Sequence, residues 1–381
     1  IWGAAAYLAW SWYEGEAAVN AAGELVRNRE DARLWGALAL LAWSLLGRMV
    51  LLPLLARPDR APDRAPDRGD AFRLSRGEVR TLPGPLGDLS IDIAGPAAGD
   101  VVCLTHGWGL DSRIWTRLRQ VLAARYRVIS WDLPGMGRSR GEVGSTQLEM
   151  MAETLERVIA EAGDSRVLLV GHSIGGMTIQ TLARDHGLPP QIAGVVLVNT
   201  TYRNPLQTMW AGALARALRW PLIEPMMRLT AITGPVAQGL AWLGYLNGHA
   251  HLANRLGFAG EATRSQLEAT TRLTVSNRQD VQAAGNLAMF RWSGEAGLPR
   301  LTAPTLVLGG DADLVTKAEA SRAIAEQAPQ ARLDLVARAN HMGFLEQSDA
   351  YISAIERFAK QVFAPPQAAS GPAPSSVRAA G

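Results

Sequence analysis

The chain has 381 residues, enough for one large α/β domain of roughly 250–300 residues and an additional segment. Its hydrophobic content of 48% can fill a sizeable core. A formal net charge of +3 with scattered basic residues argues against a nucleic-acid partner. The single cysteine, Cys103, excludes an internal disulfide and a zinc site built on several thiolates.

The N-terminal region is apolar in two places. Residues 1–13 are rich in tryptophan but too short to span a bilayer alone. A polar stretch over 14–33 separates them from Leu34–Ala56, which has the length of a span. Arg48 lies about two-thirds along it, near enough to an interface for its side chain to reach the headgroups. We predict that residues 1–56 are a membrane-associating region, the alternative being a helix packed on a soluble domain.

A linker is expected over residues 57–69, where Pro-Asp-Arg recurs every four residues. Regular prolines prevent a helix and predict an extended spacer between membrane and globular domain. Arginines flank the apolar segment on both sides, with a slight excess after it, which favours a cytoplasmic position for that domain. These are Arg27, Arg29 and Arg33 before the segment and Arg57, Arg60, Arg64 and Arg68 after it.

Strands and helices alternate through residues 70–363 and predict an α/β fold with a doubly wound, mostly parallel sheet. A helical insertion is expected at about 202–291, with its Met and Trp side chains in the core, and the Ala/Pro-rich tail 364–381 is expected to be disordered. The expected strands are 78–82, 86–93, 101–105, 127–131, 167–170, 192–198, 305–308 and 333–336. The expected helices include 113–124, 147–162, 318–327 and 349–362.

The candidate nucleophile is Ser173, in Gly171-His172-Ser173-Ile174-Gly175-Gly176. The apolar run before this sequence and the helical spacing after it predict a strand, a tight turn and a helix. A strand, a tight turn and a helix are the context that a G-x-S-x-G nucleophile elbow requires. The turn is strained, and glycines on both sides of the serine remove side chains that would collide there. A glycine-rich turn without chemistry is the alternative for this motif taken by itself.

A base and an acid for Ser173 are expected after later strands. His341 follows the last strand on a loop, where an imidazole could reach the serine. Asp311 and Asp313 follow the strand before it; we favour Asp313 as the acid and Asp311 as a turn former. The order serine, aspartate, histidine along the chain is the one typical of a triad built on a nucleophile elbow.

Taken together, these motifs resemble the α/β-hydrolase family over about residues 77–363. The motifs are His106-Gly107-Trp108-Gly109, Asp132-Leu133-Pro134-Gly135-Met136-Gly137-Arg138-Ser139, the sequence around Ser173, Gly310-Asp311-Ala312-Asp313 and Asn340-His341. The resemblance implies an oxyanion hole made by the amides of Trp108 and Ile174. It also implies a serine nucleophile, unlike the aspartate of the family's dehalogenase and epoxide-hydrolase branches.

The expected function is hydrolysis of carboxylic esters with apolar acyl groups, through an acyl-serine intermediate. The substrate would be a small-molecule ester or lipid, and no metal or cofactor is expected because the corresponding motifs are missing. Within the same fold, carbon–carbon bond hydrolysis or cofactor-free perhydrolysis are alternatives. A non-catalytic, ligand-binding member is an alternative of another class.

Overall fold

The structure is a computed structural model that describes residues 1–59, 77–85 and 87–365. Most of the expected linker and almost all of the expected disordered tail therefore lie outside the described residues.

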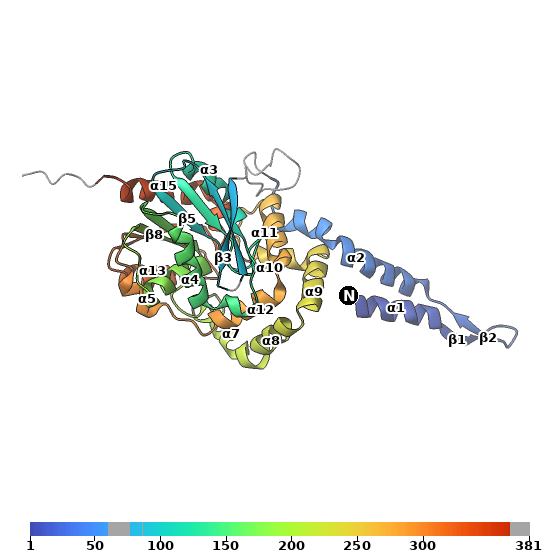
Figure 1. The fold of residues 1–381 in the computed structure, drawn as a ribbon. Coiled ribbons are helices and arrows are strands. Elements are labelled where there is room, and N and C mark those ends of the chain that lie inside the picture. Colours follow the sequence, from blue (N-terminus) through green and yellow to red (C-terminus); the bar gives the residue numbers. More distant parts are fainter. Residues whose placement is uncertain (60–76, 86, 366–381) are drawn as a thin grey trace, which may run out of the picture.

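An eight-stranded sheet forms the centre of the molecule (Figure 1), with strand order β10-β9-β8-β7-β5-β6-β4-β3. The strands from β5 to β10 run parallel, and β3 and β4 add an antiparallel edge. The strands are β3 (Glu78–Gly84), β4 (Gly87–Ala94), β5 (Val101–Thr105), β6 (Arg127–Trp131), β7 (Val167–His172), β8 (Ile192–Val198), β9 (Thr305–Gly310) and β10 (Ala331–Val336). The predicted, mostly parallel α/β fold is confirmed.

Helices cover both faces of this sheet, as a doubly wound fold requires. Alternate residues of each strand point to opposite faces, so Val101 and Cys103 join one core cluster and Val102 and Leu104 the other. One face is covered by α4 (Leu148–Ala160), α5 (Ile174–Asp185) and α13 (Ala318–Gln327), the other by α3 (Thr116–Leu122) and α15 (Ser348–Val362). Burial on both faces explains why these strands read as continuous apolar runs.

The segment between β8 and β9 is helical. Its helices are α6 (Pro205–Thr208), α7 (Gly212–Leu218), the π-helical turn η4 (Arg219–Ile223), α8 (Glu224–Ile232), α9 (Gly234–Leu246), α10 (His249–Arg255), α11 (Arg264–Ser276) and α12 (Gln279–Met289). We expected its Met and Trp side chains in the core, and for several this is wrong. Trp210, Trp220 and Met226 are 66%, 64% and 53% exposed, because only one side of these helices packs on the protein.

The N-terminal region is a helical hairpin that projects from the body of the molecule (Figure 1). It consists of α1 (Trp2–Glu14), β1 (Glu16–Val19), β2 (Leu25–Asn28) and α2 (Asp31–Leu55). Residues 14–33, which we expected only to be a polar stretch, thus contain an antiparallel strand pair. Among the described residues, α2 is the one helix long and apolar enough to cross a membrane, and 11% of its most apolar 18-residue stretch is buried.

The second half of α2 packs on the insertion. The Arg48 guanidinium donates to Glu268 at 2.9 Å and to the Tyr245 hydroxyl at 3.0 Å. Its expected orientation toward lipid headgroups is therefore wrong, because a carboxylate of α11 neutralises it. The end of α2 is also held by main-chain bonds, since Arg57 N donates to Ala262 O at 2.8 Å.

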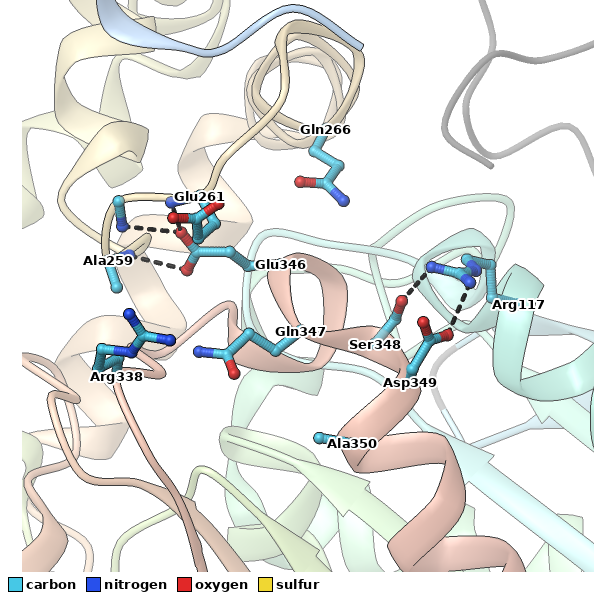
Figure 2. Close-up of a pocket in the computed structure, with 11 residues that line it drawn as sticks. Arg117, Ala259, Glu261, Gln266, Arg338, Glu346, Gln347, Ser348, Asp349 and Ala350 are labelled. Atoms are coloured by element: carbon cyan, nitrogen blue, oxygen red, sulfur yellow. Dashed lines mark hydrogen bonds and ion pairs between the residues drawn. The ribbon is translucent and has the colours of Figure 1, made fainter. Parts of the chain in front are cut away.

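The insertion in turn holds the loop that follows β10. Asn340 Nδ2 donates to the carbonyl of Leu256 at 2.9 Å, and Met342 N to that of Gly257 at 2.7 Å. In Figure 2, the buried Glu346 carboxylate, at the end of α14 (Gly343–Glu346), accepts from the amide of Ala259 at 2.8 Å. This contact borders a hollow of about 510 Å³. The segment between α10 and α11 thus supports the loop that carries His341.

Candidate active site

Ser173 lies at the turn between β7 and α5. Its backbone has φ 53° and ψ −117°, a conformation that is unfavourable for a residue with a side chain. The Ser173 amide donates to Val198 O at 3.0 Å, and the Thr200 hydroxyl donates to Ser173 O at 2.6 Å. These bonds to the end of β8 and to the residues after it hold the strained turn.

The glycines around Ser173 are required by close backbone contacts. A Cβ on Gly171 would lie 2.5 Å from the carbonyl carbon of Gly175, and one on Gly175 would lie 2.6 Å from Thr105 O. A Cβ on Gly176 would lie 2.7 Å from Thr200 Oγ1. Strand, turn and helix therefore approach as closely as the nucleophile-elbow motif predicts.

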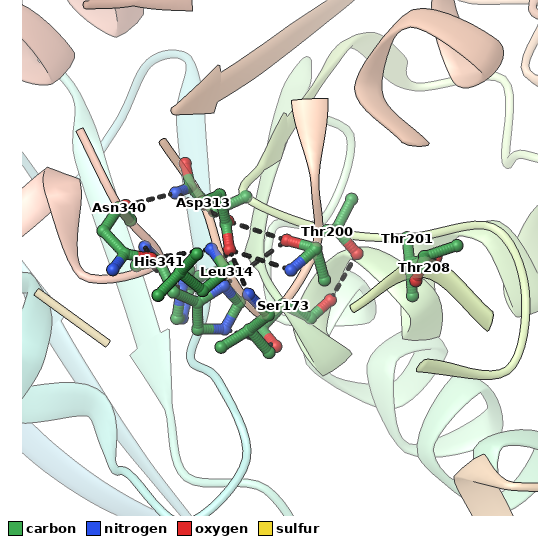
Figure 3. A network of polar contacts seen from close by, with 12 residues as sticks. Ser173, Thr200, Thr201, Thr208, Asp313, Leu314, Asn340 and His341 are labelled. Atoms are coloured by element: carbon green, nitrogen blue, oxygen red, sulfur yellow. Dashed lines mark hydrogen bonds and ion pairs between the residues drawn. The ribbon is translucent and has the colours of Figure 1, made fainter. Parts of the chain in front are cut away.

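The structure brings Ser173, Asp313 and His341 into one hydrogen-bonded chain (Figure 3). His341 Nε2 lies 3.1 Å from Ser173 Oγ, and His341 Nδ1 lies 3.0 Å from Asp313 Oδ2. The three residues follow β7, β9 and β10, whose carboxyl ends meet at one edge of the sheet. Asp313 and His341 are buried and Ser173 is partly exposed.

The electrostatics of these three hydrogen-bonded residues fix the proton of the His341 ring on Nδ1. Burial by itself would raise the pKa of Asp313, but the neighbouring His341, which donates a hydrogen bond to it, and the donors of Thr316 bring that pKa below its ordinary value. Asp313 is then ionised at neutral pH and can only accept a hydrogen bond. His341 Nδ1 must donate to it, which leaves Nε2 free to accept the proton of Ser173.

Asn199 is a supporting residue that the sequence interpretation missed. In the structure, Asn199 Nδ2 donates to Asp313 Oδ2 at 3.1 Å and to Asn340 O at 2.8 Å. The buried Tyr351 hydroxyl donates to Asn199 Oδ1 at 2.9 Å and fixes the orientation of the amide. The amide thus bridges the loops that carry the acid and the base. A polar residue at the end of a buried strand was the signal in the sequence.

Asp311 lies in the same loop but does not contact His341. Its Oδ1 accepts from the amide of Arg338 at 2.6 Å, which closes the turn after β10. This contact fits the expected role of Asp311 as a turn former.

The two residues expected to supply oxyanion donors lie on different elements. Ile174 is the first residue of α5, where main-chain N–H groups have no partner within the helix. Trp108 lies in the loop after β5, and its indole nitrogen donates to Gln282 O of α12 at 3.2 Å. This loop touches α5, since a Cβ on Gly175 would lie 2.9 Å from His106 O.

His172 packs against the base. The centres of the His172 and His341 rings are 4.8 Å apart, and His172 Nε2 lies 3.2 Å from His341 O. Burial and the neighbouring His341 hold the pKa of His172 well below its ordinary value. A neutral ring beside His341 adds no competing charge there.

No metal-binding cluster is found in the described parts of the chain, where no three His, Cys, Asp or Glu side chains are grouped to hold an ion.

Comparison with known proteins places this geometry in context. The family described as the alpha/beta hydrolase fold matches residues 100–348. A pimeloyl-[acyl-carrier protein] methyl ester esterase of Sodalis glossinidius is 34% identical over 151 residues, which cover 37% of this chain and 56% of that protein. Another protein of that name, from Nitrosospira multiformis, is 26% identical over 288 residues, covering 72% of this chain and 100% of its own. The solved enol-lactonase from Burkholderia xenovorans LB400 has a TM-score of 0.61 at 20% identity, covering 74% of this chain and 100% of its own.

Proposed function

The chain belongs to the α/β-hydrolase family and is a hydrolase that acts on esters, and from this premise we propose that it cleaves carboxylic esters of apolar acyl groups through an acyl-serine intermediate. The observation that supports the proposal is the hydrogen-bonded chain from Ser173 through His341 to Asp313. The names of the relatives support the ester bond as the target.

In the proposed reaction, Ser173 Oγ attacks the ester carbonyl while His341 Nε2 takes its proton. The amides of Trp108 and Ile174 stabilise the oxyanion, a contribution of about 2.7–4 kcal/mol for one such donor. The imidazolium, stabilised by Asp313, gives the proton to the leaving alkoxide. His341 next removes a proton from water, whose oxygen attacks the acyl-serine carbonyl. On release of the carboxylic acid, Ser173 recovers its proton from His341.

The test combines labelling and turnover. A fluorophosphonate probe should label Ser173 in the wild-type chain, and Ser173→Ala should abolish both labelling and hydrolysis of nitrophenyl esters. The elbow glycines set the backbone here, so the variant should keep the wild-type unfolding temperature. A folded chain that neither reacts with the probe nor hydrolyses any ester would instead be a ligand-binding member. A series of acyl chain lengths tests the apolar preference, and equal kcat/KM for acetyl and octanoyl esters would contradict it.

We also propose that α2 anchors the enzyme in a membrane, with the catalytic domain on the cytoplasmic side. The part of α2 that precedes its contacts with the insertion, residues 31–46, is about 24 Å long at 1.5 Å per residue, which reaches most of the way across the ~30 Å of a hydrocarbon core. The exposure of most of α2 supports this proposal, because so apolar a surface is costly in water. Complete release of the full chain from membranes by carbonate would contradict it, and protease access in sealed vesicles tests the side.

A further inference from the structure

The outer side of the helices from α7 to α9 is apolar. From Leu222 in η4 to Leu240 in α9, large exposed side chains recur every three or four residues, which places those of each helix on one side of it. Ile232 is 80% exposed and Val236 is 64% exposed. We call this surface the outer apolar face; it comprises Leu214, Leu218, Trp220, Leu222, Met226, Leu229, Ile232, Val236, Leu240 and Trp242. Exposed apolar side chains in this number, on helices that follow one another along the insertion, indicate a surface with a partner.

The polarity of these helices is inverted relative to that of a surface helix facing water. The only carboxylate between residues 212 and 246 is Glu224, which is fully buried and pairs with Arg219 at 2.7 Å. Met226 and Leu229, on the opposite side of α8 from Glu224, are exposed. A charge turned inward and apolar groups turned outward fit an environment of low dielectric outside the protein.

The remaining charges of this segment are basic. Between residues 212 and 246 there are three arginines and one glutamate, and the side chains of Arg216 and Arg228 are exposed. Basic groups bordering an apolar surface with exposed tryptophans are typical of segments that lie in the interface of a membrane containing anionic lipids.

The outer apolar face is continuous with α2. The end of α9 lies against α2 so closely that a Cβ on Gly47 would be 2.6 Å from Asn247 O, and one on Gly248 would be 2.6 Å from Leu51. Arg48 of α2 also donates to the hydroxyl of Tyr245 in α9 at 3.0 Å and pairs with Glu268 of the neighbouring α11 at 2.9 Å. A bilayer around α2 would therefore meet α9 near the level of residues 47–51.

We propose that the outer apolar face rests on the surface of a lipid bilayer, with its side chains in the headgroup and upper acyl region. This inference rests on the proposed membrane anchoring by α2. Beneath the face, α8 packs on α12, and a main-chain carbonyl of α12, that of Gln282, accepts a hydrogen bond from the indole of Trp108 in the loop after β5. The insertion that borders the active site would thus lie at the lipid surface, and amphiphilic esters dissolved in the bilayer would be its substrates.

The experiment uses single cysteines carrying a polarity-sensitive nitrobenzoxadiazole label on the full chain, reconstituted in phosphatidylcholine/phosphatidylglycerol vesicles. The native Cys103 does not interfere, because it is buried and burial raises the pKa of its thiol to about 12. Leu229→Cys, Ile232→Cys and Val236→Cys report on the outer apolar face. Leu46→Cys reports on α2, and Val121→Cys on α3 is the matched exposed control.

Labels at 229, 232 and 236 should emit at shorter wavelength than the label at 121 and lose emission when brominated lipids replace the normal ones. If the labels at these three positions behave like the label at 121 while the label at 46 is quenched, the inference about the outer apolar face is wrong and the anchoring by α2 stands. If the label at 46 is not quenched either, both the inference and the proposed anchoring are wrong. Excimer emission from pyrene at 232 that persists in a large excess of lipid would show that a second copy covers the face, and would also overturn the inference.

Activity supplies an independent readout. Ile232→Asp should slow hydrolysis of a long-chain ester embedded in vesicles several-fold and leave hydrolysis of a water-soluble nitrophenyl ester unchanged. Equal activity of this variant and the wild type on the embedded ester would contradict the role of the face. If the wild type itself did not hydrolyse the water-soluble nitrophenyl ester, the result would instead count against the proposed esterase function.

Discussion

Replacing Asp313 by asparagine tests the proposed reaction most directly, because it preserves the shape of the side chain while it removes the charge and replaces one acceptor oxygen by an NH₂ donor. In the structure, Asp313 Oδ1 accepts from the amides of Val315 at 2.7 Å and Thr316 at 2.8 Å, and Oδ2 faces His341 Nδ1 at 3.0 Å. The two amides would retain the asparagine oxygen, so its NH₂ group would face His341. His341 Nδ1 would then have to accept, which moves the proton to Nε2, where Ser173 needs an acceptor.

The expected loss for Asp313→Asn is about 10⁴-fold in kcat, the size seen when such a triad is held in the wrong tautomer. At ~1.36 kcal/mol per tenfold change, this corresponds to ~5.5 kcal/mol of transition-state stabilisation. The assay is steady-state hydrolysis of a nitrophenyl ester, with the unfolding temperature measured alongside. Asp311→Asn is the matched control and should change kcat little, because Asp311 contacts the Arg338 amide and not His341. If Asp313→Asn kept more than about a tenth of kcat, or if Asp311→Asn lost as much, the assignment of the acid would be refuted.

Two further predictions concern stability. Burial by itself would raise the pKa of Glu268, but the hydrogen bonds from His251 and Tyr245 and the charge of Arg48 bring it below the ordinary 4.5. A lowered pKa stabilises the folded state above pH 4.5, so thermal unfolding should show wild type more stable than Glu268→Gln near neutral pH. That difference in stability should shrink as the pH falls through the lowered pKa of Glu268. A difference that grew on acidification would contradict the stabilising role of the contacts of Glu268. Gly175→Ala should cost about 1–3 kcal/mol or more in the free energy of unfolding, since its Cβ would meet Thr105 O at 2.6 Å. Gly239→Ala, whose Cβ would meet nothing within 4 Å, is the control, and equal denaturation midpoints for the two variants would rule out the steric argument.

Much of the central domain could be predicted from the sequence because its signals are local. A parallel strand buried on both faces is a short apolar run, so Val101–Thr105 and Ile192–Val198 were predicted with the bounds that the structure has. The elbow is equally local, since the Ser173 turn excludes side chains within a few residues on either side. The choice of Asp313 and His341 followed from their positions after later strands, because parallel strands bring their carboxyl ends to one edge.

The tertiary structure alone decided which way side chains point when the partner is distant in the chain. Arg48 and Glu268 are 220 residues apart, and nothing near either residue indicates that they form a pair. Asn199 supports Asp313 only because β8 lies between β7 and β9 in the sheet. For the insertion, helical spacing identifies a helix with an apolar side but not whether that side faces the core or the outside. The inward turn of Glu224 resolves this, since a buried carboxylate is tolerated only where an arginine meets it.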